Sequence, residues 1–548
     1  MNAFLRMVVL LIFISGLYFI LPKIKIDNSI VRWLPDSSAT VDEYKKFLEK
    51  FNSDALLILA VESVDSAFYS KEISPGIEKV AQLEHVISID TWPAKNIQYK
   101  KESVAGVSSF IIRFKPNSHL NPNRPELIAQ IMGIFVDIDA KIHLAGTGVI
   151  YQAINEQTRI EMGKYLLLGI FLLICALVVL IRKPVAILQT LLVAIGGVAS
   201  IFYVSALCDV PISLVHTLIP IITLFYSTSI SLHILFHAGD FKKVIKPTFL
   251  VIMTTCIGFS VFLLDRTPIL KDFAIIGLTG LISSFFWSLV IFYPKAYQYK
   301  VSNIIKMRFA GFPVLSRFIT LPVAILVLAF SIPGILNLQA EINSLSVLSK
   351  DDRAVRDHIY IDEKVGHYFP LEYIVDESKY SRREVSKWVN TIYKMEQVGA
   401  VIPYYRLPNF INKKTAGYQS KSDDNLYRIT FMVPLLYHTA GMELVNKMDV
   451  ISDDYFAVFR PQLTGYMTLY ANVADGLFSS LSSKSANIIS ADTFHHLFVF
   501  EKNETHTPDA SGQFITNCCD AGNYGLVTDK ARYGNDSNRV SDIKYCGG

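Results

Sequence analysis

Seven apolar runs of about 20 residues, separated by polar segments, limit what this chain can fold into more than any other feature. An α-helix rises 1.5 Å per residue, so about 20 apolar residues cross a hydrocarbon core roughly 30 Å thick. The runs lie at about 3–22, 164–181, 184–206, 212–236, 247–264, 273–293 and 318–337. The sequence therefore predicts an α-helical membrane protein with about seven spans and excludes a single soluble globule.

The overall composition agrees with a membrane protein. Of the 548 residues, 51% are hydrophobic and only 18% are charged, whereas a typical soluble domain has about 25% charged residues. The mean hydropathy is +0.35. The 52 basic and 48 acidic residues leave a net charge of +4, and no basic tract is present, so nucleic acid is not an expected partner.

The basic residues of the loops predict an orientation, because lysine and arginine accumulate on the cytoplasmic side. The loops after the second, fourth and sixth runs carry ten: Arg182, Lys183, Lys242, Lys243, Lys246, Lys295, Lys300, Lys306, Arg308 and Arg317. The opposite short loops carry only Arg266 and Lys271. The first run lacks a small-residue cleavage site and is expected to stay as an anchor. We therefore expect a cytoplasmic N-terminus, with the long polar segments on the outer side of the membrane, which in a bacterium is the periplasm.

The first long segment, 23–161, alternates strand and helix patterns. Strands are predicted at 54–62, 86–89, 108–114 and 141–145, and helices at 75–83 and 125–137. The order βαββαβ is that of the ferredoxin-like unit. An outer α+β domain is therefore expected after the first span.

The segment after the seventh run repeats this order. Strands are predicted at 371–375, 400–404, 426–433 and 457–463, and helices at 382–395 and 442–448. Short sequence pairs also recur: Asn28-Ser29 as Asn343-Ser344, and Thr147-Gly148 with Asn155 as Thr464-Gly465 with Asn472. We interpret the two segments as copies produced by a tandem duplication.

This organisation resembles the RND superfamily of transporters. The stretch Trp33-Leu34-Pro35-Asp36, the helical pattern of 41–51 and Gly146-Thr147-Gly148 are similar to its MMPL-type branch of hydrophobe and amphiphile exporters. The resemblance covers roughly residues 1–480. It implies a first transmembrane helix (1–22), a periplasmic porter-like domain (23–161), a five-helix, sterol-sensing-like bundle (162–297), a cytoplasmic linker (298–317), a seventh transmembrane helix (318–338) and a second porter-like domain (339–480).

The last segment, 481–548, departs from the family. By the duplication, an eighth span should begin near 481, but no run after Ser480 reaches even 12 apolar residues. The stretch from Glu501 is rich in Asn, Asp, Gly, Ser and Thr, a composition typical of disorder. The second transmembrane bundle of the family is therefore expected to be absent, and the sequence leaves a truncated product and a natural half-transporter as alternatives.

No motif of a soluble enzyme is present. The sequence has no Gly-x4-Gly-Lys-Ser/Thr, His-Glu-x-x-His or Gly-x-Ser-x-Gly pattern. Its six cysteines fit neither zinc-ligand spacing nor a disulfide framework. We therefore expect no enzymatic activity, no metal and no cofactor, and transport driven by an ion gradient if the protein is active.

The fourth run holds the largest concentration of polar residues in the predicted membrane region. Tyr226, Ser229, His233 and His237 follow i, i+3, i+7 and i+11, which predicts one helix face, and Pro220 predicts a kink. This face is a candidate proton relay, with His233 as its titratable member. Helix packing through serine and threonine is the alternative. Close helix packing is also predicted by glycines at 196, 197, 277 and 280.

The MMPL-type resemblance leaves the proton relay open. That branch usually carries an aspartate and a tyrosine in this run, and the matching positions here are Ser229 and Ile230, whereas His233 matches. The resemblance implies movement of a lipid-like or hydrophobic amphiphile, with membrane lipid as its partner. A homo-oligomer, or a partner chain that supplies the missing bundle, is also expected. A non-transporting membrane receptor or scaffold, or an inactive half-transporter, remains the alternative function.

Overall fold

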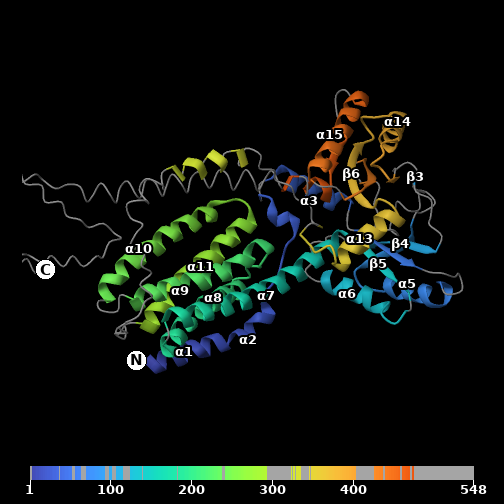
Figure 1. Cartoon of the computed structure of the whole chain (residues 1–548). Helices are drawn as coiled ribbons and strands as arrows, with labels where there is room; N and C mark the ends of the chain where they lie inside the picture. The colour runs from blue at the N-terminus through green and yellow to red at the C-terminus, as the bar shows by residue number, and fades with distance from the viewer. Residues whose placement is uncertain are drawn as a thin grey trace, which may run out of the picture. The chain divides into compact units, whose positions relative to one another are not determined.

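The computed structural model describes residues 3–292, 322–334 and 345–473, each range with gaps, of which the largest is 403–421. The chain divides into a unit of residues 1–490 and a unit of residues 491–548. All the described residues belong to the first unit, which is shown in Figure 1. The predicted tail, 481–548, lies outside them.

The described residues include six helices that are long and apolar enough to cross a membrane. The first contains α1 (Ala3–Ser15), α2 (Leu17–Ile20) and η1 (Leu21–Lys23). The others are α7 (Thr147–Ile181), α8 (Pro184–Leu207), η5 (Leu214–Thr217) with α9 (Leu218–Phe236), α10 (Phe241–Ser260) with η6 (Val261–Leu264), and α11 (Pro268–Phe292). They match six of the seven predicted runs. Half of the seventh run, 318–337, falls outside the described residues, and its span stays a prediction.

Helix α7 begins much earlier than predicted. The apolar run starts at residue 164, but the helix starts at Thr147 and continues for 35 residues, which is about 52 Å at 1.5 Å per residue. Hydropathy detects only the apolar part of such a helix, and no proline interrupts the polar part before it. The boundary predicted near 161 therefore falls inside one continuous helix.

The first outer domain contains a four-stranded antiparallel sheet in the order β2-β4-β1-β5. Its strands are β1 (Leu56–Glu62), β2 (Val86–Thr91), β4 (Val107–Phe114) and β5 (Ile142–Gly146). Its helices are α5 (Ser74–Ala81), which follows the π-helical turn η3 (Tyr69–Ile73), and α6 (Arg124–Ile134). We call residues 56–146 the first copy.

The second outer domain, residues 369–464, has the same order of elements, and we call it the second copy. Its strands are β6 (Phe369–Asp376), β7 (Ala400–Ile402), β8 (Leu426–Val433) and β9 (Gln462–Thr464), and its helices are α14 (Arg382–Tyr393) and α15 (His438–Tyr455). The sheet order β7-β8-β6-β9 repeats that of the first copy, with β3 (Gln98–Tyr99) added beside β7. The prediction of two βαββαβ units is confirmed.

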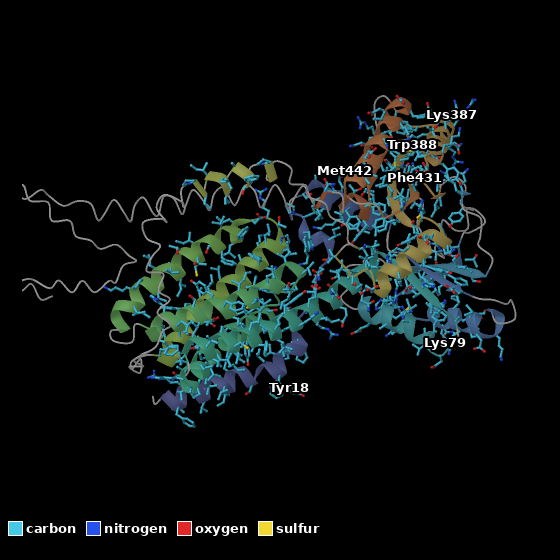
Figure 2. The ribbon with its side chains drawn as sticks, in the orientation of Figure 1. Tyr18, Lys79, Lys387, Trp388, Phe431 and Met442 are labelled. Atoms are coloured by element: carbon cyan, nitrogen blue, oxygen red, sulfur yellow. The ribbon has the colours of Figure 1, made fainter. Side chains whose placement is uncertain are left out.

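Local sequence explains the elements of the second copy. Alternate residues of β6, beginning at Phe369, lie in the core on the side covered by α14. Helix α14 begins with a capping box, in which Ser381 and Glu384 satisfy each other's backbone N–H groups. Its Trp388 packs edge-to-face on Phe431 of β8, with ring centroids 5.8 Å apart. Figure 2 labels both residues in the second copy. This aromatic cluster forms the centre of the second copy.

Each copy is completed by a helix that precedes the other copy in the chain. Helix α3 (Ala39–Phe51), predicted from the 41–51 pattern, contacts β9 and joins the core of the second copy, following the short 3-10 turn η2 (Ile30–Trp33). Helix α13 (Arg353–Lys364) contacts β5 and joins the core of the first copy. Strand β3, which belongs to the first copy by sequence, pairs with β7 of the second. The two copies are therefore interlocked rather than merely adjacent.

The transmembrane bundle packs closely at small residues, as the glycines predict. A Cβ atom at Gly280 of α11 would overlap the hydroxyl of Thr223 of α9. At Gly197 of α8 it would lie 2.9 Å from the hydroxyls of both Ser227 and Ser284. Close helix approach at glycine and serine is a common way for membrane helices to associate. Helices α8, α9 and α11 therefore form the tightly packed centre of the described bundle.

Candidate functional site

The polar side chains that α9 turns into the bundle are small hydroxyl groups. Thr223, Ser227 and Ser231 are buried at intervals of four residues. The hydroxyl of Ser227 lies 2.6 Å from that of Ser284 on α11, and both also reach the backbone carbonyl four residues earlier in their own helices. Such contacts hold helices together without a titratable group.

The predicted relay residues lie on a different face. Tyr226 is half-buried, whereas Ser229 and His233 are exposed on the surface of the described bundle. His237 lies outside the described residues. The stripe Tyr226–Ser229–His233 is therefore not the face that packs into the bundle. Residues 226 and 227 point about 100° apart on a helix, so the stripe and the buried hydroxyl groups occupy different faces of α9. The proton relay stays a prediction.

The predicted kink at Pro220 stays a prediction. Pro220 stands in the first turn of α9, where its missing N–H would have no partner within that helix. The proline inside a described membrane helix is Pro247, in α10. Position within the helix, rather than the presence of proline, decides its effect.

The outer ends of the helices are joined by a polar network. Asp27 accepts a hydrogen bond from the hydroxyl of Tyr151 on α7 at 2.6 Å. Arg32 forms an ion pair with Asp272 of α11, and Asn28 donates to Asn155 of α7 at 2.8 Å. The segment between the first span and α3 is thus fixed to two membrane helices. Sequence reasoning noted Asn28 and Asn155 only as marks of the duplication.

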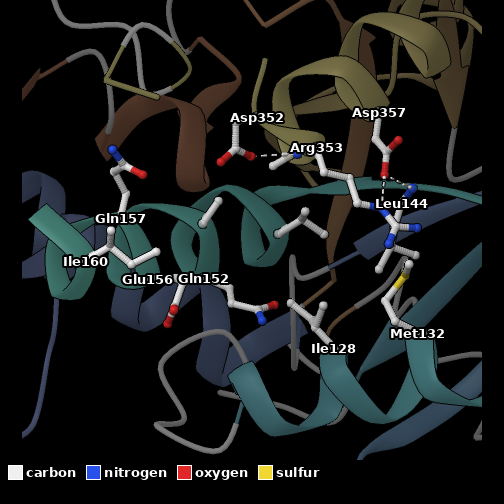
Figure 3. Close-up of a pocket in the computed structure, with 13 residues that line it drawn as sticks. Ile128, Met132, Leu144, Gln152, Glu156, Gln157, Ile160, Asp352, Arg353 and Asp357 are labelled. Carbon is white, nitrogen blue, oxygen red and sulfur yellow. Dashed lines mark hydrogen bonds and ion pairs between the residues drawn. The ribbon is translucent and has the colours of Figure 1, made fainter. Parts of the chain in front are cut away.

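The best candidate for a binding site is a pocket of about 260 Å³ beside the outer part of α7. Figure 3 shows Ile128 and Met132 toward one end of it and Glu156 and Gln157 toward the other. It is lined by α6 (Ile128, Met132), β5 (Leu144), α7 (Val149, Gln152, Ala153, Glu156, Gln157, Ile160) and α13 with its N-cap (Asp352, Arg353, Ala354, Asp357). The pocket therefore has an apolar floor and a polar rim, as expected for a ligand site.

One wall of the pocket is the exchanged helix α13, which is held against the first copy by two histidines. His143 of β5 lies 2.8 Å from Asp357 through Nδ1 and 3.2 Å from Glu62 through Nε2. Its ring stacks on that of Tyr360 with centroids 3.8 Å apart. The backbone N–H of Leu144 also donates to Asp357. These contacts fix the position of the wall.

The second histidine, His358, lies inside the wall and is neutral. Its Nδ1 donates to the carbonyl of Ala354 at 2.6 Å, and its Nε2 accepts from the N–H of Gly146 at 3.3 Å. A carbonyl only accepts and an N–H only donates, so one tautomer of the neutral ring satisfies both partners. Burial lowers the pKa of His358 to about 4.

The pocket can bind a ligand, but its geometry offers no catalytic arrangement. Among the described residues, no group of three or more His, Cys, Asp or Glu side chains could hold a metal ion. The carboxylate of Asp357 contacts His143 and Arg353 and accepts a hydrogen bond from the backbone N–H of Leu144.

Sequence reasoning missed this pocket. A signal was present, because Val149, Ala153, Glu156 and Ile160 follow i, i+4, i+7 and i+11 and so share one face of α7. The contribution of α13 could not be found in this way, since it comes from more than 190 residues further along the chain.

Comparison with solved structures finds similarity to a heavy metal efflux pump in two crystal forms. The first form matches with a TM-score of 0.39 and 11% identity, over 77% of this chain and 51% of that chain. The second matches with a TM-score of 0.33 and 10% identity, over 82% and 52%. The chain thus spans about half the length of each of these two structures. No protein-family model matches the chain, and no curated protein is similar to it in sequence.

Proposed function

We propose that the protein is a membrane transporter of the RND type, in the MMPL-type branch, and that it moves a lipid-like or hydrophobic amphiphile. One observation carries the proposal: α7 lines the pocket with its first turns and crosses the membrane with the rest of its 35 residues. A binding site built on a membrane-spanning helix lies within reach of molecules that partition into the bilayer.

An exposed apolar strip on α7 connects the pocket with the membrane part of the helix. Ile160, at the edge of the pocket, is 53% exposed. Exposed side chains of Tyr165, Leu167, Leu168 and Phe171 follow along α7. A hydrocarbon chain that moves along this strip stays in contact with apolar surface at each step, which reduces its exposure to water. The strip therefore offers a path between bilayer and pocket.

The rest of the proposal comes from the sequence. We infer that transport uses an ion gradient, that the protein has no enzymatic activity, and that its partner is a membrane lipid or hydrophobic substrate. We further propose a bacterial inner membrane as its location, with the N-terminus in the cytoplasm and both copies in the periplasm. The asymmetry of basic loop residues supports this orientation. A topology reporter fused after Asn337 should report the periplasm; a cytoplasmic signal would reverse the orientation.

The transport proposal is tested with the purified full chain in liposomes. Loading and movement of a labelled amphiphile are measured with and without a pH gradient, beside liposomes without protein. The proposal expects protein-dependent movement that the gradient accelerates. The matched variants are His233→Ala, on the exposed face of α9, and Ser227→Ala, in its packed interior. Loss of the gradient effect in His233→Ala alone would support a proton relay, whereas equal gradient dependence in both variants and the parent would exclude one at His233.

A membrane receptor or scaffold is the second candidate. The observation that favours it is the bonding of the hydroxyls inside the bundle, where Ser227, Ser284 and Ser288 reach carbonyls of their own helices. This pattern serves packing and needs no ion. Saturable binding of the amphiphile with no movement across the bilayer in the same liposomes would favour the receptor.

A further inference from the structure

The volume of the pocket limits the hydrocarbon that it can hold. A cavity of 150 Å³ lined by aliphatic and aromatic side chains accommodates a benzene molecule. On this scale the volume of about 260 Å³ holds roughly ten carbon atoms. One alkyl chain of this length fits between Ile128, Met132 and Leu144, whereas the two chains of a diacyl lipid exceed the volume.

The rim of the pocket is acidic. Its charged side chains are Glu156, Asp352, Asp357 and Arg353. The guanidinium of Arg353 is bonded within the pocket wall: its Nη2 donates to the carbonyl of Ile142 at 3.2 Å, and its Nε lies 3.5 Å from Asp357. Glu156 pairs with Arg159 on the exposed flank of α7. The rim is left with the half-buried carboxylate of Asp352 and with Glu156, whose pair with Arg159 is exposed to solvent and therefore weak. Both carboxylates favour a positive charge nearby.

The N-terminus of α13 does not reverse this preference. A helix N-terminus attracts anions through its unpaired N–H groups. Here Asp352 is the N-cap and accepts a hydrogen bond from the N–H of Ala354 at 2.8 Å, so a carboxylate of the protein already occupies that position. An anionic head group at the rim would be repelled by this carboxylate.

The rim also presents polar groups that suit an ammonium head. Gln152 is half-buried at the rim and lines the pocket with its side chain. Its amide oxygen and the carboxylate oxygens of Asp352 accept hydrogen bonds, and an ammonium group donates them. Gln152, Glu156 and Asp352 all line the pocket, and Figure 3 labels all three.

We propose that the pocket binds single-chain amphiphiles with a cationic head group, an amine or a quaternary ammonium, with the alkyl chain on the apolar floor and the head group at Asp352 and Glu156. The inference rests on the proposed function for the ligand's path through the membrane, but binding itself needs no gradient. It therefore names the substrate class of the transporter.

The test measures binding to the full chain in nanodiscs of zwitterionic phospholipid, with empty nanodiscs as the blank. The probes are radiolabelled decylamine, decyltrimethylammonium, decanol and decyl sulfate. Saturable retention of about one amine per chain is expected, with decyl sulfate bound at least tenfold more weakly. Equal or tighter binding of decyl sulfate overturns the proposal.

Three variants assign the binding to this pocket. Asp352→Asn keeps an N-cap residue and removes the charge, and Glu156→Gln removes the second charge; each should weaken amine binding about 3- to 10-fold and leave decanol unchanged. Ala153→Phe should fill the floor and abolish binding of every probe. Glu43→Gln, on the exposed side of α3, is the matched control. Unchanged amine binding in both charge variants, or in Ala153→Phe with a normal melting curve, contradicts the assignment.

The outcomes separate this inference from the proposed function. Amine binding that is lost in Ala153→Phe, without any movement across liposomes, overturns transport and leaves the binding class standing. Transport of a diacyl lipid or an anionic amphiphile that Ala153→Phe does not affect overturns the binding class and leaves transport standing.

Discussion

The two copies share one topology, but equivalent buried positions in their sheets carry different kinds of side chain. The ladder of β1 with β4 places Leu56 and Ile111 where the ladder of β6 with β8 places Glu372 and Arg428. In the second copy these two residues form a buried ion pair with an N···O distance of 2.5 Å, at 0% and 1% exposure. In the first copy both positions are apolar and lie in a hydrophobic cluster.

The helix that completes each copy fits the chemistry beneath it. Phe47 of α3 covers Arg428, with the guanidinium 5.0 Å from the ring centroid, and Thr430 donates to Glu372 at 2.6 Å. Helix α13 instead places Ile361 and Val365 on the apolar face of the first sheet and uses histidine contacts at its edge. A duplicated fold is thus specified by strand order and burial, whereas individual buried pairs can diverge together with the helix that covers them.

Breaking the buried ion pair should have the largest effect. Glu372→Leu or Arg428→Ile alone leaves an uncompensated charge inside the second copy, which typically costs about 3–5 kcal/mol of folding free energy. Thermal unfolding in detergent should show a strongly lowered melting temperature or no folded protein.

The double variant Glu372→Leu/Arg428→Ile is the matched control, because it imports the residues of the first copy. Replacement of both partners by apolar residues is often neutral or stabilising, so it should melt close to the parent protein. If the double variant is as unstable as either single variant, the two ladder positions are not equivalent.

Weakening the attachment of α3 to the second copy should have the next largest effect on stability. Phe47→Ala removes a fully buried ring and should cost about 3 kcal/mol. Because α3 joins the second copy, protease cleavage near α3 and β9 should increase while the first copy stays protected. Phe4→Ala, at a side chain that is exposed in α1, should change neither. Equal loss of protection in both copies would contradict separate attachment of the two helices.

Acid should weaken the attachment of α13 but not that of α3. Burial holds the pKa of His358 near 4, and the nearby Asp357 and Asp362 raise it only in part. The ring of the unfolded chain has a pKa of about 6.5. The stability that the neutral ring of His358 gives the folded state is therefore complete above pH 6.5 and is lost as the pH falls toward 4. The loss amounts to about 2 kcal/mol at pH 5. The protection factors of the α13 amides, which relate each exchange rate to the intrinsic rate at the same pH, should therefore fall between pH 7 and pH 5.

The variant His358→Gln carries an uncharged amide at this position. The protection factors of its α13 amides should depend less on pH than those of the parent protein, while those of α3 are alike in both. A pH dependence that survives the substitution would assign the effect to another group.

An exposed ion pair in the second copy should have the smallest effect. Arg382 and Glu377 lie 2.9 Å apart, but the arginine side chain is 68% exposed. Arg382→Gln should change the free energy of unfolding by no more than about 0.5 kcal/mol. A loss close to that of Arg428→Ile would show that burial does not set the difference between the two pairs.

Much of the fold could be predicted because periodicity is local. The strand Leu426–Val433 has the predicted boundaries, and six apolar runs correspond to helices. The exchange of α3 and α13 could not be predicted, because an amphipathic helix reveals that it buries a face but not which copy it covers. The pocket was missed for the same reason, since Asp352 and Ala354 reach it only through that exchange.

A disulfide across the β3–β7 pair can show whether the two copies are interlocked. Tyr99 and Ala400 are ladder partners. In the next pair along the ladder, the backbone N–H of Lys100 donates to the carbonyl of Gly399. Tyr99 and Ala400 therefore form a non-hydrogen-bonded pair with Cα atoms about 4.5 Å apart, within the range for a disulfide. Tyr99→Cys/Ala400→Cys should form this bond spontaneously in the full chain, as detected by mass spectrometry of proteolytic fragments. Gln98→Cys/Ala400→Cys, with side chains on opposite faces, should not. Absence of the bond in the first pair, or equal bonding in both, would contradict the interlocked arrangement.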